Sequence, residues 1–161
     1  MTGNATQLTD LIGLLYQSAD RAESSEQLHR ELTFSMGFVA SSVHSWSPIT
    51  GKEVVHQMAL RDHEPGSEAL KAIIADYNAK WVRLNPLPRI GFMKGLLREG
   101  AVIGRHEFIS DEGWRDSDFF SEISDLTEEV HTYSVIVRNL PKKIIIFNFS
   151  TNERPCEARR H

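Results

Sequence analysis

Histidine has the widest chemical range of the residue types in this chain, because its ring can ligate a metal, carry a proton or hydrogen-bond to a ligand. Seven histidines are present, with no H-x3-H or HExxH spacing and no CxxC pair, so the sequence predicts no metal site. His44 and His56 lie in two segments with strand-like patterns joined by turn residues. If that hairpin closes symmetrically around residues 47–51, alternation places both rings on one sheet face with Trp46.

Two rings at diagonal positions of such a hairpin would lie about 7–8 Å apart, which is too far for both to hold one ion without bending inward. Two interpretations of His44 and His56 stay open at this point. Each ring is either hydrogen-bonded structurally or exposed at the sheet end, or else it contacts a bound ligand.

Nucleophilic and phosphate-binding motifs are missing from the sequence. There is no G-x-S-x-G elbow and no P-loop, and the single cysteine, Cys156, lies in a polar tail. Paired carboxylates such as Asp116 and Asp118 have the pattern of solvated surface charges. The sequence therefore predicts a protein that is not an enzyme and needs no cofactor.

Aromatic residues at core-facing positions, together with a few polar ones, are the composition of an apolar pocket with convergent polar groups. Simple core packing is the alternative for each aromatic residue. The candidate ligand-binding residues are His44, Trp46, His56, Tyr77, Trp81, Asn85, Trp114, Phe119 and Tyr133.

These residues must be positioned by helices whose apolar residues recur with a period near 3.6. We expect helices over residues 6–19, 24–36, 67–84, 90–97 and 110–126. Ser24 and Gln27 have the spacing of a capping box, and Ser67 can cap the strongest of the five. That helix must end at Asn85, because the residue before a proline resists the helical conformation.

Segments of strand-like pattern predict two hairpins and one isolated strand. We expect strands over residues 38–46, 53–60, 101–105, 130–138 and 143–149. With the helices between them, they predict an α+β fold in which a five-stranded antiparallel sheet carries flanking helices. This is the layout of GAF-like and PAS-like domains. We expect a single domain over residues 1–150 and a disordered polar tail over residues 151–161.

The bulk composition excludes several classes of protein. The 161 residues carry a net charge of −4, which argues against nucleic-acid binding through this domain. The N-terminus lacks the features of a signal peptide, and no apolar run approaches the length of a membrane helix. We expect a cytoplasmic protein.

Two short stretches resemble the N-terminal sensor domains of LuxR-type, helix-turn-helix transcription regulators. The first is YNAKWVRLNPL, from Tyr77 to Leu87, which is similar to their Y-x-x-x-(Y/W)-x-x-x-(N/D)-P segment. The second is WRDSDFFSE, from Trp114 to Glu122, which looks like their (L/W)-R-x-S-x-F-(Y/F)-x-E helix. The resemblance extends over roughly residues 60–149.

The resemblance implies a GAF-like or PAS-like sensor of the quorum-sensing type that forms a homodimer. The best-known members of that family bind acyl-homoserine lactones. In that family an aspartate before the proline contacts the ligand amide, and the corresponding residue here is the uncharged Asn85. The resemblance therefore implies a small apolar or amphipathic ligand without fixing a lactone. The helix-turn-helix domain that follows in the family is missing after residue 161, through either a cut or a natural lack of that domain.

Two functions remain open on this basis. The first is a small-molecule-sensing regulatory domain of transcription whose ligand lies between the sheet and the helices of residues 67–97. The second is a ligand-free dimerisation or interaction module that modulates a full-length regulator. The apolar face of residues 8–19 would be a natural surface for it.

Overall fold

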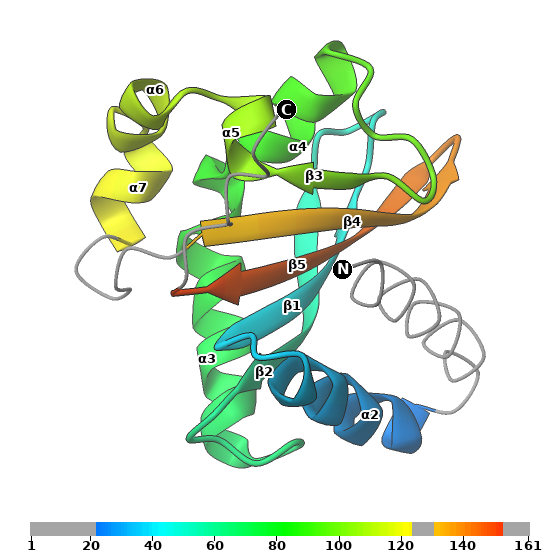
Figure 1. Cartoon of the computed structure of the whole chain (residues 1–161), viewed down its shortest axis with the longest axis vertical. Helices are drawn as coiled ribbons and strands as arrows, with labels where there is room; N and C mark the ends of the chain where they lie inside the picture. The colour runs from blue at the N-terminus through cyan, green and yellow to red at the C-terminus, as the bar shows by residue number, and fades with distance from the viewer. Residues whose placement is uncertain (1–21, 124–130, 153–161) are drawn as a thin grey trace, which may run out of the picture.

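A five-stranded sheet forms the centre of the molecule in the computed structural model of the chain, which describes residues 22–123 and 131–152 (Figure 1). The strands lie in the order β2-β1-β5-β4-β3, and every neighbouring pair is antiparallel. They are β1 (Ala40–Trp46), β2 (Glu53–Leu60), β3 (Val102–Gly104), β4 (His131–Leu140) and β5 (Lys143–Thr151). The predicted α+β fold with one antiparallel sheet in a single domain is confirmed.

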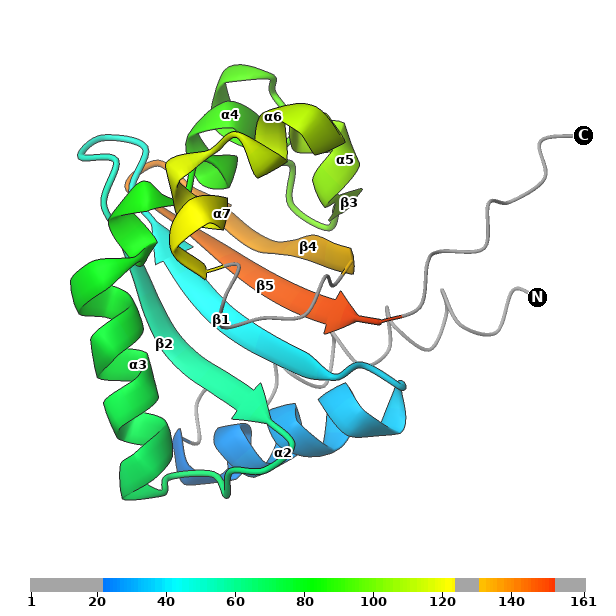
Figure 2. The same ribbon diagram turned by 90° about the vertical axis from the view of Figure 1, so that its left-hand side faces the viewer.

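Helices cover both faces of the sheet (Figure 2). They are α2 (Ala22–Ser35), α3 (Glu68–Lys80), the 3-10 helix η1 (Val82–Leu84), α4 (Leu87–Met93), α5 (Arg105–Phe108), α6 (Asp111–Arg115) and α7 (Asp118–Ile123). Helix α2 packs on one face, where His29 contacts Phe147 with ring centroids 4.8 Å apart. The other described helices lie on the opposite face, which we call the pocket face, or along its β2 edge.

The first hairpin forms as predicted but in a different register. Residues 47–52 make the turn, in which Gly51 has φ 69°, a conformation that favours glycine. Trp46 therefore lies opposite Glu53, and His44 lies opposite Val55. A bulge follows, at which the pairing shifts between Val43 and His44.

This register overturns the expectation that His44 and His56 share a face. A slip of one residue moves every side chain of a strand to the other side of the sheet. The His56 ring lies 2.7 Å from the hydroxyl of Ser45, whose side chain points away from the face that carries His44. Burial, followed by the charge of Lys143 and by His44, lowers the pKa of His56.

The second hairpin is longer than predicted. Strand β4 continues to Leu140, so Pro141 and Lys142 alone make the turn. Strand β5 includes Thr151, which was expected to begin the tail, while residues 153–161 lie outside the described part.

The helices differ from the predicted ones mainly at their ends. The helix expected over residues 110–126 is divided into two short helices in its described part, which ends at residue 123. The Ser117 hydroxyl accepts the N–H of Phe120 and so caps α7 within the predicted span. Helix α4 begins at Leu87, earlier than expected, and α5 was not predicted. Helix α2 already includes Ala22, so Ser24 lies inside the helix, and the predicted helix of residues 6–19 lies outside the described residues.

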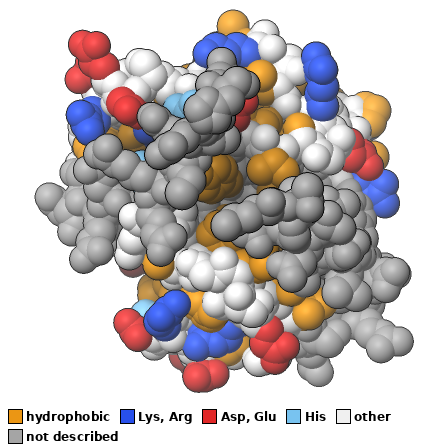
Figure 3. All heavy atoms as spheres, in the orientation of Figure 1, with side chains coloured by type: hydrophobic (Ala, Val, Ile, Leu, Met, Phe, Trp, Pro, Cys, Tyr) orange, Lys and Arg blue, Asp and Glu red, His pale blue; other side chains and the backbone are white. Residues whose placement is uncertain are grey.

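Each face of the sheet has its own apolar cluster. The larger one is on the pocket face, toward the end of the sheet that holds both hairpin turns. It comprises Trp46, Leu97, Ile103, Phe108, Ile136, Ile144 and Ile146. The smaller one, on the α2 face, includes Val135, Phe147 and Phe149. On the side shown in Figure 3, acidic and basic side chains are scattered around the rim and hydrophobic ones gather toward the middle.

Candidate functional site

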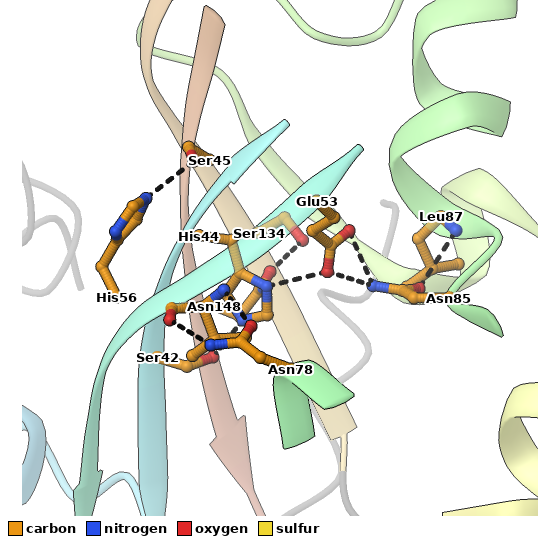
Figure 4. A network of polar contacts seen from close by, with 11 residues as sticks. Ser42, His44, Ser45, Glu53, His56, Asn78, Asn85, Leu87, Ser134 and Asn148 are labelled. Carbon is orange, nitrogen blue, oxygen red and sulfur yellow. Dashed lines mark hydrogen bonds and ion pairs between the residues drawn. The ribbon is translucent and has the colours of Figure 1, made fainter. Parts of the chain in front are cut away.

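A continuous chain of hydrogen bonds crosses the pocket face beside its apolar cluster (Figure 4). The Ser42 hydroxyl lies 2.6 Å from Nε2 of His44, and Nδ1 of the same ring lies 2.9 Å from Oε1 of Glu53. The side-chain amide of Asn85 donates to both carboxylate oxygens of Glu53, over 3.1 and 3.3 Å. The chain therefore joins two strands of the sheet to the helical layer above them.

The backbone around each residue explains why the chain forms. Ser42 and His44 are two positions apart on β1, so their side chains point to the same face. Glu53 is the first residue of β2, where the hairpin register brings it diagonally across from His44. Asn85 precedes Pro86 and has the extended conformation (φ −68°, ψ 112°) that a following proline favours. Its side-chain oxygen accepts the first N–H of α4, at Leu87.

A second polar pair lies next to this chain on the central strands. Ser134 on β4 donates to the side-chain oxygen of Asn148 on β5 over 2.6 Å. Asn148 in turn lies opposite Ser42 across the β1–β5 pairing. Two separate pairs of strands therefore place polar side chains side by side in an otherwise apolar layer.

A small cavity lies between these polar groups and the helices. The space within it is roughly that of one water molecule. Its polar wall comes from the sheet and from Asn85, which directly follows η1, and its apolar wall comes mainly from α4 and α5. The lining residues are His44, Glu53, Asn85, Leu87, Pro88, Phe108, Ser134, Ile146 and Asn148.

Glu53 dominates the electrostatics of the cavity. Only 3% of its side chain and 5% of that of His44 are exposed to solvent. A buried carboxylate is costly unless hydrogen bonds or an opposite charge compensate it, and here His44 and Asn85 supply the donors. Burial, and then the charge of Glu53, raise the pKa of Tyr77 far above its ordinary value, so the phenol stays neutral.

Of the nine predicted ligand-binding residues, the structure places His44 and Asn85 at the cavity. Tyr77 lies next to them, with its ring centroid 6.4 Å from that of His44. From Tyr77 a row of aromatic contacts leads through Phe119 to Trp114, with centroid distances of 6.2 and 5.6 Å. These aromatic residues thus form a cluster that adjoins the cavity through His44.

Trp81 joins this cluster, and the other predicted residues lie elsewhere. Trp81 contacts Tyr77 at the end of α3, with ring centroids 6.0 Å apart. Trp46 is buried in the apolar cluster and contacts Phe92, with ring centroids 5.4 Å apart. Tyr133 lies opposite Phe149, on the sheet face away from the cavity, as His56 does. The predicted set is therefore spread over both faces, although it was expected to line one pocket.

Sequence reasoning missed several cavity residues, most importantly Glu53, Ser134 and Asn148. Ser134 and Asn148 did leave a signal, because each is a polar residue at an inward position of a strand that is otherwise apolar. Glu53 left none, since an acidic residue directly after a turn normally faces solvent.

The order Ser42, His44, Glu53 is also the order of the groups that activate a serine nucleophile in hydrolases. Ser42, however, is not among the residues that line the cavity. Strand β1 is paired with β2 on one side and β5 on the other, which engages the backbone N–H groups that could otherwise form an oxyanion hole. The arrangement fits the positioning of Glu53 better than the activation of Ser42.

The described residues provide neither a metal-binding cluster nor a helix that could span a membrane. Within residues 22–123 and 131–152, no group of three or more His, Cys, Asp or Glu side chains could hold a metal ion. In the same part of the chain, none of the helices has the length and apolar character needed to cross a bilayer.

Comparison with known proteins gives a match in structure alone. No family model matches the sequence, and no curated protein sequence is significantly similar to it. The fold is similar to that of the VqsR LBD domain, a ligand-binding domain from Pseudomonas aeruginosa, with a TM-score of 0.60 and 9% sequence identity. The match covers 92% of this chain and 82% of that one, so the likeness shows that the two share a fold.

Proposed function

We propose that this chain is a regulatory sensor domain that binds a small amphipathic molecule at the cavity between the sheet and α4. The observation that carries the proposal is a buried polar chain, Ser42–His44–Glu53–Asn85, beside an apolar wall in a fold shared with a ligand-binding domain. A few convergent polar groups in an apolar setting are what fixes the orientation of a small ligand.

The cavity must open to receive such a ligand. Pockets that hold small molecules have volumes of about 300–1,000 Å³, whereas the space here is roughly that of one water molecule. Leu87 and Pro88 close it from α4, a helix of seven residues whose last residues, Phe92 and Met93, are exposed. Movement of α4 away from the sheet would enlarge the cavity without breaking a strand pairing.

A ligand that binds the open form better than the closed form shifts the balance between them. We infer that this shift changes how the domain pairs with a second copy or with a full-length transcription regulator in the cytoplasm. The similarity of residues 77–87 and 114–122 to LuxR-type sensors supports this output. In this proposal the domain neither catalyses a reaction nor binds a cofactor or nucleic acid.

Native mass spectrometry of the purified full chain, before and after denaturation, tests the proposal. We expect a co-purified small molecule that is lost when Asn85→Ala removes the amide bonded to Glu53. Asn139→Ala is the matched control, because the Asn139 side-chain amide also donates a hydrogen bond, but to the carbonyl of Leu97, away from the cavity. No added mass in the wild-type chain, even after incubation with lipid extracts and lactones, would contradict the proposal.

A ligand-free interaction module is the second candidate, favoured by exposed apolar side chains at one end of the molecule. Ile49 lies in the first hairpin turn, Leu140 directly before the second, and Phe92 and Met93 at the end of α4. Both turns lie at the same end of the sheet, and Phe92 contacts Trp46 there. Contiguous exposed apolar surface is a feature of protein interaction sites.

Sedimentation equilibrium distinguishes the two candidates. The interaction module predicts a dimer without any co-purified mass, and Met93→Glu should convert that dimer into a monomer. Met93 is 76% exposed, so its substitution should leave the fold intact. A dimer that persists in this variant would show that the apolar end is not the interface.

A further inference from the structure

We propose that the cavity at Glu53 receives the primary ammonium group of an amphipathic amine. The inference rests on the proposed function and names the head group of the ligand. It follows from the hydrogen bonds that Glu53 makes, the size of the cavity and the placement of apolar side chains around it.

The Glu53 carboxylate has room for a further donor. A carboxylate offers about four acceptor positions on its two oxygens. Oε1 accepts His44 at 2.9 Å and Asn85 at 3.1 Å, whereas Oε2 accepts only the longer, 3.3 Å contact from the same Asn85 amide. Among the described residues, no lysine or arginine is ion-paired with Glu53. Oε2 is therefore the oxygen of this buried carboxylate that can accept a further donor.

The size of the cavity selects among head groups. A primary ammonium is about as large as the single water molecule for which there is space, and it supplies three donors. A carboxylate or phosphate is larger and carries the same sign of charge as Glu53, whose side chain is only 3% exposed. At this depth the repulsion between like charges is weakly screened by solvent.

The polar wall offers a second acceptor for the same head group. The Asn148 side-chain oxygen accepts one hydrogen bond, from Ser134, and a carbonyl oxygen can accept two. Both residues line the cavity together with Glu53. An ammonium nitrogen in the cavity would thus have acceptors from two residues of its lining, which is how a buried cation is stabilised.

The apolar part of the ligand has a defined surface to contact. Leu87 and Pro88 on α4, Phe108 on α5 and Ile146 on β5 complete the lining. When α4 moves outward, these side chains lose contacts with one another. An alkyl chain attached to the ammonium would replace those contacts. The two walls together match a cationic head on an apolar body.

Three probes of equal chain length test the head group: hexylammonium, hexanoate and hexanol, each titrated into the full chain at the same pH and ionic strength. Binding is followed by isothermal calorimetry. Nuclear Overhauser contacts from the probe to the methyl groups of Leu87 and Ile146 locate it. We expect hexylammonium to bind with both contacts, and hexanoate to show neither heat nor contacts.

Substitution of the carboxylate identifies its role. We expect Glu53→Gln to weaken hexylammonium binding about tenfold or more, since a hydrogen bond to a charged partner is worth about 1.5–3 kcal/mol. Glu68→Gln is the control, because the Glu68 side chain is 92% exposed on α3. If Glu53→Gln does not fold, the Overhauser contacts in the wild-type chain still decide whether the amine occupies the cavity.

Failure of this inference can be told apart from failure of the proposed function. Equal binding of hexanoate or hexanol, or binding of hexylammonium without contacts to Leu87 and Ile146, would overturn the ammonium assignment. A co-purified ligand without an amine would do the same while leaving the sensor proposal intact. If no probe binds, the inference is wrong. If no ligand co-purifies either, the sensor proposal fails as well.

Discussion

Glu53 and His44 form the most deeply buried ionisable pair that the structure describes. Removing one partner of such a pair leaves the other without its hydrogen bond. We expect Glu53→Ala to lower the free energy of unfolding by about 3 kcal/mol, measured by urea denaturation. Glu68→Ala, at an exposed site of the same residue type, should change it by less than about 0.5 kcal/mol. Equal effects of the two substitutions would contradict the buried pairing.

His29 gives the molecule a predictable pH dependence. Burial lowers its pKa from 6.5 to about 4, so the folded state resists protonation that the unfolded chain accepts. Because of this residue, the free energy of unfolding is highest above pH 6.5 and falls as the pH drops from 6.5 toward 4. The loss attributable to this residue is about 3 kcal/mol by pH 4.

The check is urea denaturation at pH 7 and at pH 4.5 for the wild-type chain and for His29→Gln. The variant should be less stable at pH 7, since the bond between His29 and Ser41 is altered, and should lose less stability on acidification. An equal loss in both proteins would assign the acid sensitivity to other groups.

The sequence indicated part of the site at this scale. Strand alternation had pointed to His44, and the resemblance to LuxR-type sensors had pointed to Asn85; both line the cavity. Glu53 was not predicted, because its burial depends on where the hairpin register places it. It depends also on the Asn85 amide, which is 32 residues away in the sequence. Long-range compensation of a charge leaves no local pattern.

At the scale of elements, α3 protects the open edge of the sheet. The side-chain amide of Asn78 donates to the carbonyl of Val55 and accepts its N–H, over 2.9 and 2.8 Å. It thereby replaces the strand that β2 lacks on its outer side.

We expect Asn78→Ala to destabilise the fold by about 1–2 kcal/mol, because two backbone groups lose their partner. Hydrogen exchange should show faster exchange of the Val55 amide, with the central strand β5 unaffected. Asp76→Ala, two residues earlier on the solvent side of α3, is the control. Unchanged protection of Val55 would mean that the edge does not depend on this contact.

The strands were more predictable than their register. Alternation and turn residues located all five strands to within a few residues, because each has a buried face. The bulge beside His44 was not predictable, since it adds one residue to β2 without changing its composition. The break between α6 and α7 was missed for a similar reason, as Ser117 fits a helix interior and a cap equally well.

At the scale of the whole molecule, the cavity depends on how the strands are ordered in the sheet. Polar side chains that interrupt the apolar layer of the pocket face come from β1, β2, β4 and β5 and from Asn85, the residue after η1. Only the complete sheet order brings them together, so the cavity could not be derived from any one segment. The same fold at 9% identity shows that this layout tolerates almost complete replacement of its residues.

The central claim is that a small molecule binds on the pocket face, where α4 closes over Glu53. Methyl NMR of the full chain, with an organic extract of cells added, tests it most directly. The account predicts shifts of the Leu87 and Ile146 methyl signals, which line the cavity, and none for Val43, which packs on the opposite face. Leu87 and Ile146 signals that remain unchanged, or shift no more than those of Val43, would contradict it.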